Sequence, residues 1–452
     1  FAIHYGSSNI AVAFIIAFGI GVAISGLVGS SIQSAVLPRL VAPDGGLVIA
    51  AVRFMAMMTA VAAGLSLTLV MLAGPSSQLL ASHASVEAPL MGDLLRITGI
   101  FLLAQVVAGE ATVISLARGH RLVPAIGPAF PSLAAGAGMV ILPGIDIRLA
   151  YLLLTIGTIL QIAVVFGNIG HSVHFQGGAL PRMGAVTTAM FVSFALLAAI
   201  VPIERIVAAG LSTASSAHYD YAMRSLRVAQ QLILGGLLLT ALGDWSARAS
   251  RVDLGHLRKS LGAAIVLGGS LLFLAASVAA VSGHSIVALV YQHGRFAATD
   301  TDAVTTLLIL ALPGFCAEGL ALIITSALLG LRKNVVLAIV GGFNFATRLT
   351  LLIALSSIWG TRGIAVAYSA SSVSILIVVI AIAHRCSLWP SEQMKSVLKG
   401  LMVGTVTAIT ALVLVVLAAH WPPFVNSLIV LLVFVAAFSK LRPVPHVRLL
   451  PQ

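Results

Sequence analysis

Two arginines lie three residues apart in the segment YDYAMRSLRVAQQ, inside a chain that is otherwise strongly apolar. On a helix, Arg224 and Arg227 share one face about a turn apart, and Gln231 extends that polar face by another turn. Two guanidinium groups are too costly to turn toward lipid, so this face is expected to line a cavity. The guanidinium group of an arginine can donate two parallel hydrogen bonds to two oxygens of one phosphate. The spacing therefore predicts binding of a phosphate or diphosphate group, with a salt bridge to Glu110 or Glu318 as the alternative.

Four further charged residues are candidates for function. Glu318, in LPGFCAEGLALII, lies in the middle of an apolar run and is a candidate for uptake and release of a coupling proton. Glu110 is a second candidate, either as a proton carrier or as the partner of a neighbouring arginine. Glu204 and Arg205 are expected to begin an outer loop, where they form an interfacial pair or line the mouth of a cavity.

Several motifs that carry catalytic chemistry do not occur in this sequence. The sequence has no G-x-x-x-x-G-K-[ST] phosphate loop, no H-E-x-x-H, no G-x-S-x-G and no cluster of cysteine and histidine. We therefore expect no nucleotide hydrolysis, no metal site, no cofactor and no catalytic residue. The chain is predicted not to be an enzyme.

The composition requires that most of the chain lies in lipid. Hydrophobic residues make up 60% of the 452 residues and charged residues only 8%, whereas a soluble domain carries about 25% charged residues. The mean hydropathy is +1.11. In lipid every backbone polar group must be bonded internally, and the apolar runs do not alternate with period two, so helices are expected rather than a barrel.

These apolar runs are long enough for about thirteen membrane-crossing helices, since one crossing takes about 20 residues. The predicted spans lie near 11–35, 49–73, 94–117, 122–143, 149–170, 184–203, 219–243, 261–281, 303–330, 334–356, 362–384, 397–419 and 424–439.

Basic residues gather in alternate loops between these spans, as is typical of the cytoplasmic side. The intervening loops, such as 74–92 and 420–423, hold little positive charge. This pattern predicts a cytoplasmic C-terminus and accounts for the net charge of +12 without nucleic acid as a partner. The basic loops include Arg118, Arg121, Arg332, Lys333 and Arg442.

Four stretches resemble one family of transporters, the MurJ/MviN lipid II flippases, in the same order and at the same spacing. The family belongs to the multidrug/oligosaccharidyl-lipid/polysaccharide exporter superfamily. The four stretches are YGSSNIAVAF (5–14), SAVLPRL (34–40), IERIVAAGLSTASSAHYDYAMRSL (203–226) and LVYQHGRFAATDTDAVTTLLILALPGF (289–315).

This resemblance implies an all-α fold of fourteen helices in two pseudo-symmetric lobes around a central cationic cavity, in a bacterial cytoplasmic membrane. Residues 1–182 would form an N-terminal lobe that lacks its first helix, 183–384 a C-terminal lobe, and 385–452 two extra helices. Arg224 falls on the arginine of the family's YA-x-R-L motif, and Glu204 with Arg205 on its D-R pair. The chain departs from the family where Val12 replaces an aspartate, and where charges of the second helix are replaced by Ser25, Gly26 and Ser30.

Three functions remain open from the sequence. The first is a flippase for lipid II or another polyprenyl-diphosphate-linked saccharide, working by alternating access and driven by Na⁺, H⁺ or the membrane potential. The second is a cation-coupled exporter of small molecules, with Glu318 or Glu110 as the coupling acid. The third is a transport-inactive membrane scaffold, whose partners would be cell-envelope synthesis proteins.

Overall fold

The protein forms two compact units, residues Phe1–Ala217 (unit 1) and His218–Gln452 (unit 2). The predicted lobe boundary at 182/183 stays a prediction. The computed structural model describes residues 2–36, 47–84, 86–117, 123, 126–142, 144–169, 175–176, 184–212, 214–250, 254–331, 333–389, 394–417 and 422–441.

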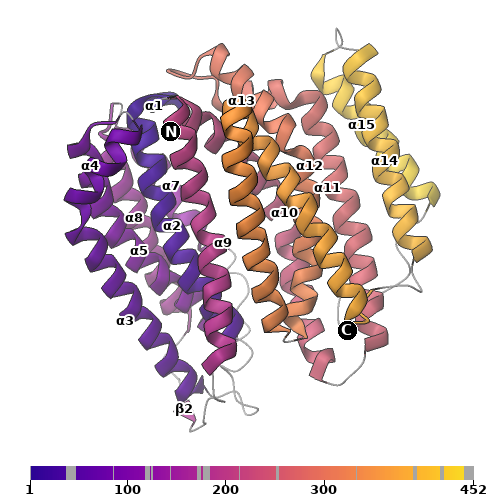
Figure 1. Ribbon diagram of the computed structural model, residues 1–452, viewed down its shortest axis with the longest axis horizontal. Helices are drawn as coiled ribbons and strands as arrows, with labels where there is room; N and C mark the ends of the chain where they lie inside the picture. The colour runs from indigo at the N-terminus through magenta and orange to yellow at the C-terminus, as the bar shows by residue number, and fades with distance from the viewer. Residues whose placement is uncertain are drawn as a thin grey trace. The chain divides into compact units, whose positions relative to one another are not determined.

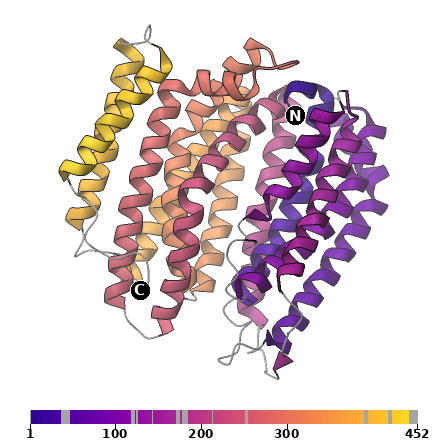
Figure 2. The same ribbon diagram turned by 180° about the vertical axis from the view of Figure 1, so that it is seen from behind.

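Unit 1 is helical because its long apolar segments can bond their backbone groups only within themselves in lipid. Two short strands pair in parallel, with Leu47 opposite Phe175. Its helices carry the indigo to magenta colours of Figures 1 and 2. The elements are α1 (Ala2–Tyr5), α2 (Asn9–Val36), β1 (Leu47–Val48), α3 (Ile49–Met71), α4 (Ala73–Ala84), α5 (Ala88–Ala117), α7 (Ala129–Ile141), α8 (Ile147–Ile169), β2 (Phe175–Gln176) and α9 (Gly184–Leu211).

Helix α5 lies at the centre of unit 1 and packs against α2, α3, α4 and α8, while α2 also packs along α9. An aromatic group joins α2, α5 and α8: Phe14 and Phe101 lie 5.1 Å and 5.6 Å from Tyr151 between ring centroids. The Tyr151 hydroxyl lies 3.0 Å from Oγ1 of Thr98. Thr98 also donates to the backbone carbonyl of Ala17. Aromatic packing with a bonded hydroxyl thus fixes the contact between these three helices.

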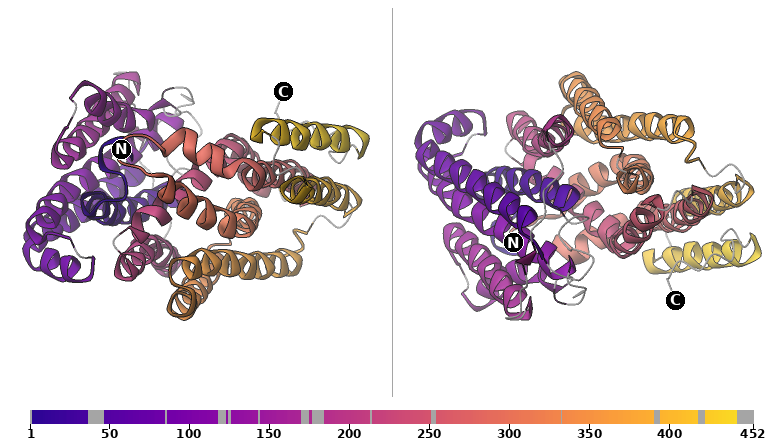
Figure 3. Two further views of the ribbon diagram at one scale, coloured as in Figure 1. Left: turned by 90° about the horizontal axis from the view of Figure 1, so that it is seen from above. Right: turned by 90° about the horizontal axis from the view of Figure 1, so that it is seen from below.

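Unit 2 is likewise helical, and its described residues include no strand. Helix α12 packs against α11 and α13, and α14 and α15 pack against α11 and against each other. Figure 3 shows α14 and α15, in yellow, side by side in the views from above and from below. The elements are α10 (Ser215–Ser250), α11 (Leu254–Tyr291), α12 (Ala298–Gly330), α13 (Asn334–Arg385), α14 (Met394–Leu417) and α15 (Pro423–Leu441).

Helix α13 consists of two helices that meet at Gly360. This residue has φ 58° and ψ −135°, which interrupts the helix between its two halves. Such a backbone conformation is open to glycine because it has no Cβ. The predicted separate spans at 334–356 and 362–384 are therefore confirmed.

Every predicted span corresponds to a helix of the structure. Among the described residues, eight helices are long and apolar enough to cross a membrane. The prediction of an all-α membrane fold is confirmed. The predicted loop at 74–92 is wrong, because α4 fills most of it and α5 begins at Ala88. Outside the described residues lie Arg118, Arg121, Arg332, Arg442, the lobe boundary at 182/183 and the first residues of the span 122–143.

Candidate anion-binding site

The arginine face of α10 is organised around an ion pair within the helix. Nη2 of Arg224 lies 2.9 Å from Oδ2 of Asp220, four residues earlier. The spacing i, i+4 places both side chains on one face, where opposite charges attract. The Asp220 side chain is only 4% exposed, whereas that of Arg224 is 39% exposed. A buried carboxylate thus holds a guanidinium that still presents part of its surface.

The next turns of α10 continue this polar face as the sequence predicts. Arg227 and Gln231 are both exposed, three and seven residues after Arg224. Gln230 is half-buried, and its Nε2 has no hydrogen-bond partner among the described residues. The ion pair of Arg224 is with Asp220 of its own helix, a partner that the sequence analysis did not name.

Near the Ser215 end of α10, aromatic side chains and a second polar pair pack beside this polar face. Tyr221 lies 5.0 Å from Tyr291 and 5.3 Å from Phe296 between ring centroids. Nε2 of His218 lies 2.7 Å from Oδ1 of Asp300, at the first turn of α12. The other carboxylate oxygen of Asp300 accepts the backbone N–H of Ala297. These contacts fix the first turns of α10 against α11 and α12.

Glu318 belongs to a separate polar cluster of unit 2. The hydroxyl of Tyr368 donates to Oε2 of Glu318 at 2.5 Å. The guanidinium carbon of Arg348 lies 4.6 Å from the centre of the Tyr368 ring, and Arg348 is only 5% exposed. A cation that lies over the face of an aromatic ring is attracted to the electron density of the ring. The cluster therefore joins α12 to both halves of α13 and brings a buried cation near the carboxylate.

Glu204 and Arg205 lie inside α9, so the prediction that they begin an outer loop is wrong. The helix continues past Pro202 to Leu211, and both side chains are buried. Nη1 of Arg205 donates to the backbone carbonyl of Ile15 in α2 at 3.2 Å. Gly19 makes room for this arginine, because a Cβ there would overlap its Nη1 atom. Arg205 thus holds α9 against α2.

Glu110 lies on α5 beside Thr59 of α3. Its Oε1 atom is buried and has no hydrogen-bond partner within the described part of the chain. The neighbouring core consists of apolar side chains such as Met58 and Val106. A carboxyl oxygen in such surroundings is costly to keep charged without a partner. Glu110 therefore stays a candidate for protonation.

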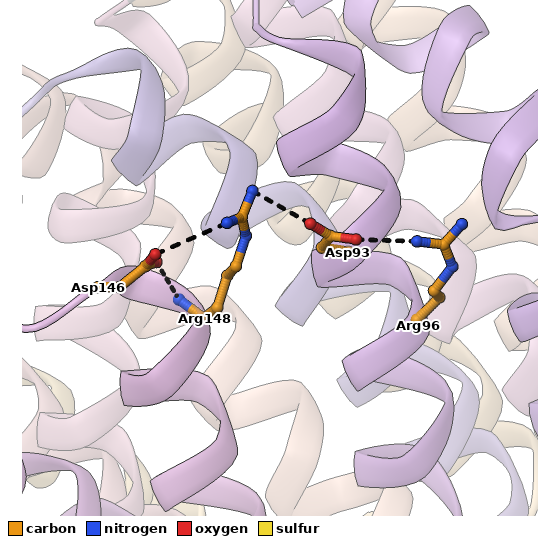
Figure 4. Close-up of polar contacts among 4 residues, drawn as sticks. All are labelled: Asp93, Arg96, Asp146 and Arg148. Atoms are coloured by element: carbon orange, nitrogen blue, oxygen red, sulfur yellow. Dashed lines mark hydrogen bonds and ion pairs between the residues drawn. The ribbon is translucent and has the colours of Figure 1, made fainter.

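A group of charges links α5 to the start of α8, as Figure 4 shows. Asp93 lies 2.8 Å from Arg96 and 3.1 Å from Arg148, and Arg148 also approaches Asp146 at 3.7 Å. Asp93 and Arg96 have the i, i+3 spacing at which opposite charges meet on one face of a helix. Nearby, burial and the Asp146 carboxylate raise the pKa of the Tyr5 phenol, which donates to the carbonyl of Ile145. All four charged side chains are well exposed, so each pair contributes at most about 1 kcal/mol.

The structure thus distributes the predicted site residues over two units. Arg224, Arg227 and Gln231 share one face of α10 in unit 2, and Glu318 lies in the same unit. Glu110, Glu204 and Arg205 belong to unit 1. The residues that the sequence reasoning missed are Asp220, Tyr368, His218, Asp300 and Tyr291. Of these, only Asp220 carried a local signal, its spacing of four residues from Arg224.

Three solved structures show what kind of protein this fold defines. A lipid II flippase MurJ in its inward closed conformation has a TM-score of 0.73 and 18% sequence identity, covering 97% of this chain and 95% of that one. An inward-facing multidrug resistance MATE family transporter of the MOP superfamily has a TM-score of 0.66 and 12% identity, covering 85% and 92%. A MOP superfamily transporter from Pyrococcus furiosus has a TM-score of 0.58 and 12% identity, covering 85% and 95%. The fold is therefore that of a multi-pass membrane transporter of the MOP type.

Within this class, the family model described as lipid II flippase MurJ matches residues 1–435. The chain belongs to the MurJ lipid II flippase family. None of the curated proteins is similar enough in sequence to match this chain.

Proposed function

We propose that this protein moves a polyprenyl-diphosphate-linked saccharide across a bacterial cytoplasmic membrane by alternating access, with its C-terminus in the cytoplasm. The observation that supports this most is the Arg224 guanidinium, which a buried carboxylate holds in place while part of its surface stays exposed. Arg227 and Gln231 on the following turns add a second cation and an amide. Such a face suits the diphosphate of the lipid, while the polyprenyl tail stays in the bilayer.

Energy for this movement is proposed to come from an ion gradient or from the membrane potential. The sequence contains no phosphate loop for ATP. Each charge that crosses the membrane is worth about 2.3 kcal/mol per 100 mV. The free energy of moving a charged diphosphate head group therefore depends on the membrane potential.

The proposal is tested with the purified chain in vesicles that contain a fluorescent polyprenyl-diphosphate-linked saccharide. We expect the labelled head group to become accessible to a quencher on the opposite side, at a rate well above that of protein-free vesicles. Vesicles with a fluorescent phosphatidylcholine in place of the saccharide lipid are the control for general lipid scrambling. If the saccharide lipid stays on its own side, the protein does not move it, and the scaffold reading is favoured.

The Glu318 cluster supports a second candidate, a cation-coupled exporter of small molecules. Glu318 is a partly buried carboxylate in α12, and it accepts its hydrogen bond from a phenol that stacks on a buried arginine. A carboxylate in such a place changes its hydrogen bond and its charge when it binds a proton. It is therefore proposed as the coupling acid for either substrate class.

Replacement of Glu318 by Gln is expected to remove the dependence of transport on an imposed pH gradient, while transport at equal pH on both sides changes less. The amide can still accept the hydroxyl of Tyr368, so the contact between α12 and α13 is kept. The measurement is the initial transport rate with and without the gradient, in wild-type and Glu318→Gln protein. The matched control is Asp302→Asn, which changes an exposed carboxylate of the same helix. An unchanged gradient dependence in Glu318→Gln would exclude Glu318 from coupling.

A further inference from the structure

The aromatic cluster of unit 2 lies directly beside the arginine that is proposed to bind the diphosphate. Tyr221 and Ser225 flank Arg224 along α10, and Oγ of Ser225 lies 3.1 Å from the hydroxyl of Tyr291 at the end of α11. The phenols of Tyr221 and Tyr291 are also within electrostatic reach of the Arg224 guanidinium. A group bound at Arg224 would therefore lie close to these side chains, as well as to Asp220.

The three aromatic side chains differ in what they leave exposed. Tyr221 and Phe296 are 2% and 3% exposed, so they serve as packing for the fold. Tyr291 is half-buried, with its ring 5.0 Å from Tyr221 and 6.0 Å from Phe296 between centroids. Its orientation is thus fixed by two rings and by the contact with Ser225. A partly exposed tyrosine with a fixed ring thus lies close to a partly exposed arginine.

We propose that Tyr291 and Ser225 form a subsite for the sugar attached to the diphosphate, a role that rests on the function proposed above. A pyranose has an apolar face of C–H groups and a rim of hydroxyls. A tyrosine offers a flat apolar ring with a polar tip, and a serine adds a second hydroxyl that both donates and accepts. Because the first sugar is bonded directly to the diphosphate, it must lie within one side chain's reach of Arg224.

In this arrangement, different residues contact different parts of the substrate. Arg224 binds the diphosphate, which every lipid-linked saccharide of this kind shares. Tyr291 and Ser225 contact the sugar, which differs between substrates. Sites of this kind combine an apolar surface with a few fixed polar groups that determine specificity. Tyr291 is therefore a specificity residue, and its loss weakens binding only when a sugar is present.

Binding of two lipids to the full-length protein in nanodiscs tests the subsite. One lipid is a polyprenyl diphosphate without sugar, and the other carries a saccharide on the same diphosphate. The Tyr291→Ala variant is expected to raise the Kd for the saccharide lipid about tenfold, the effect of losing one aromatic contact with its hydroxyl. Its Kd for the sugar-free lipid should stay within about twofold of the wild-type value.

Three further variants distinguish a sugar-binding role of Tyr291 from a role in packing alone. Tyr291→Phe and Ser225→Ala remove only hydroxyls and are expected to give smaller losses, again confined to the saccharide lipid. Phe296→Leu disturbs the same cluster without a polar group, so any effect should be equal for both lipids. Equal effects of Tyr291→Ala on both lipids, or none on either, would overturn the subsite. A wild-type protein that binds neither lipid more tightly than an uncharged polyprenol would instead refute the proposed function.

Discussion

The variant Arg224→Ala is expected to lose transport of the lipid-linked saccharide and to be less stable than the wild type. The stability loss follows because Asp220, only 4% exposed, would keep a buried negative charge without its cation. A stranded charge of this kind costs roughly 3–5 kcal/mol when fully buried. Since the arginine itself is 39% exposed, water can partly replace it, and we expect a cost of about 2–3 kcal/mol.

A double variant separates the two effects. Asp220→Asn with Arg224→Met removes the stranded charge and fills the space of the arginine stem, so most of the stability should return. Transport should not return, because the guanidinium that is proposed to bind the diphosphate is still absent. The measurements are the thermal unfolding midpoint in detergent and the transport rate in vesicles. A stable double variant that transports at the wild-type rate would show that Arg224 does not bind the substrate.

Arg227→Ala is the matched comparison on the same helix face. Arg227 is exposed, so its removal should leave the unfolding midpoint unchanged. If it binds the diphosphate together with Arg224, the apparent affinity for the lipid should fall by a smaller factor than in Arg224→Ala. This pattern distinguishes a loss of binding from a loss of structure.

The variant Gly363→Ala is expected to have the largest effect on folding. A Cβ at this position would overlap the carbonyl oxygen of Leu355 and come within 2.9 Å of the backbone nitrogen of Ser356. These are backbone atoms on the other side of the Gly360 bend, so they cannot move away without separating the two halves of α13. We expect a loss of about 3 kcal/mol or more, at the upper end for overpacking.

Gly342→Ala is the control for this glycine, because a Cβ there meets no atom within 4 Å. In a helix interior alanine is favoured over glycine by up to about 1 kcal/mol, so this variant should be as stable as the wild type or slightly more stable. The unfolding midpoint and the yield of folded protein in detergent measure both variants. Equal midpoints for Gly363→Ala and Gly342→Ala would contradict the close approach at Leu355.

Hydropathy predicted the membrane helices well because lipid leaves the backbone little choice. A long apolar run must be a helix there, and only its ends are uncertain. The same reasoning failed where polarity interrupts a helix without ending it. Helix α4, with the sequence AGPSSQLLASHA, was too polar to be read as a helix. Glu204 and Arg205 suggested the end of a helix, although their burial and the bond to Ile15 let α9 continue through them.

The candidate site was predictable only as far as its contacts are local. The face shared by Arg224, Arg227 and Gln231 follows from helical periodicity alone. The ion pair with Asp220 follows from the i, i+4 spacing within YDYAMRSL. The contact between Tyr368 and Glu318 spans fifty residues. Such a pair depends on how α12 and α13 pack, which no pattern in either segment determines.

The ion pair of Arg224 has both of its members on α10, and this has a consequence for the transport cycle. Alternating access requires helices to change neighbours, so an ion pair between two moving helices would have to break and form again in every cycle. A pair within one helix is carried along as a unit and costs no such rearrangement. The affinity of Arg224 for a diphosphate can thus stay the same at both membrane faces. In the proposed cycle, what alternates is the path by which the lipid reaches this site, while the ion gradient or the membrane potential sets the direction of net movement.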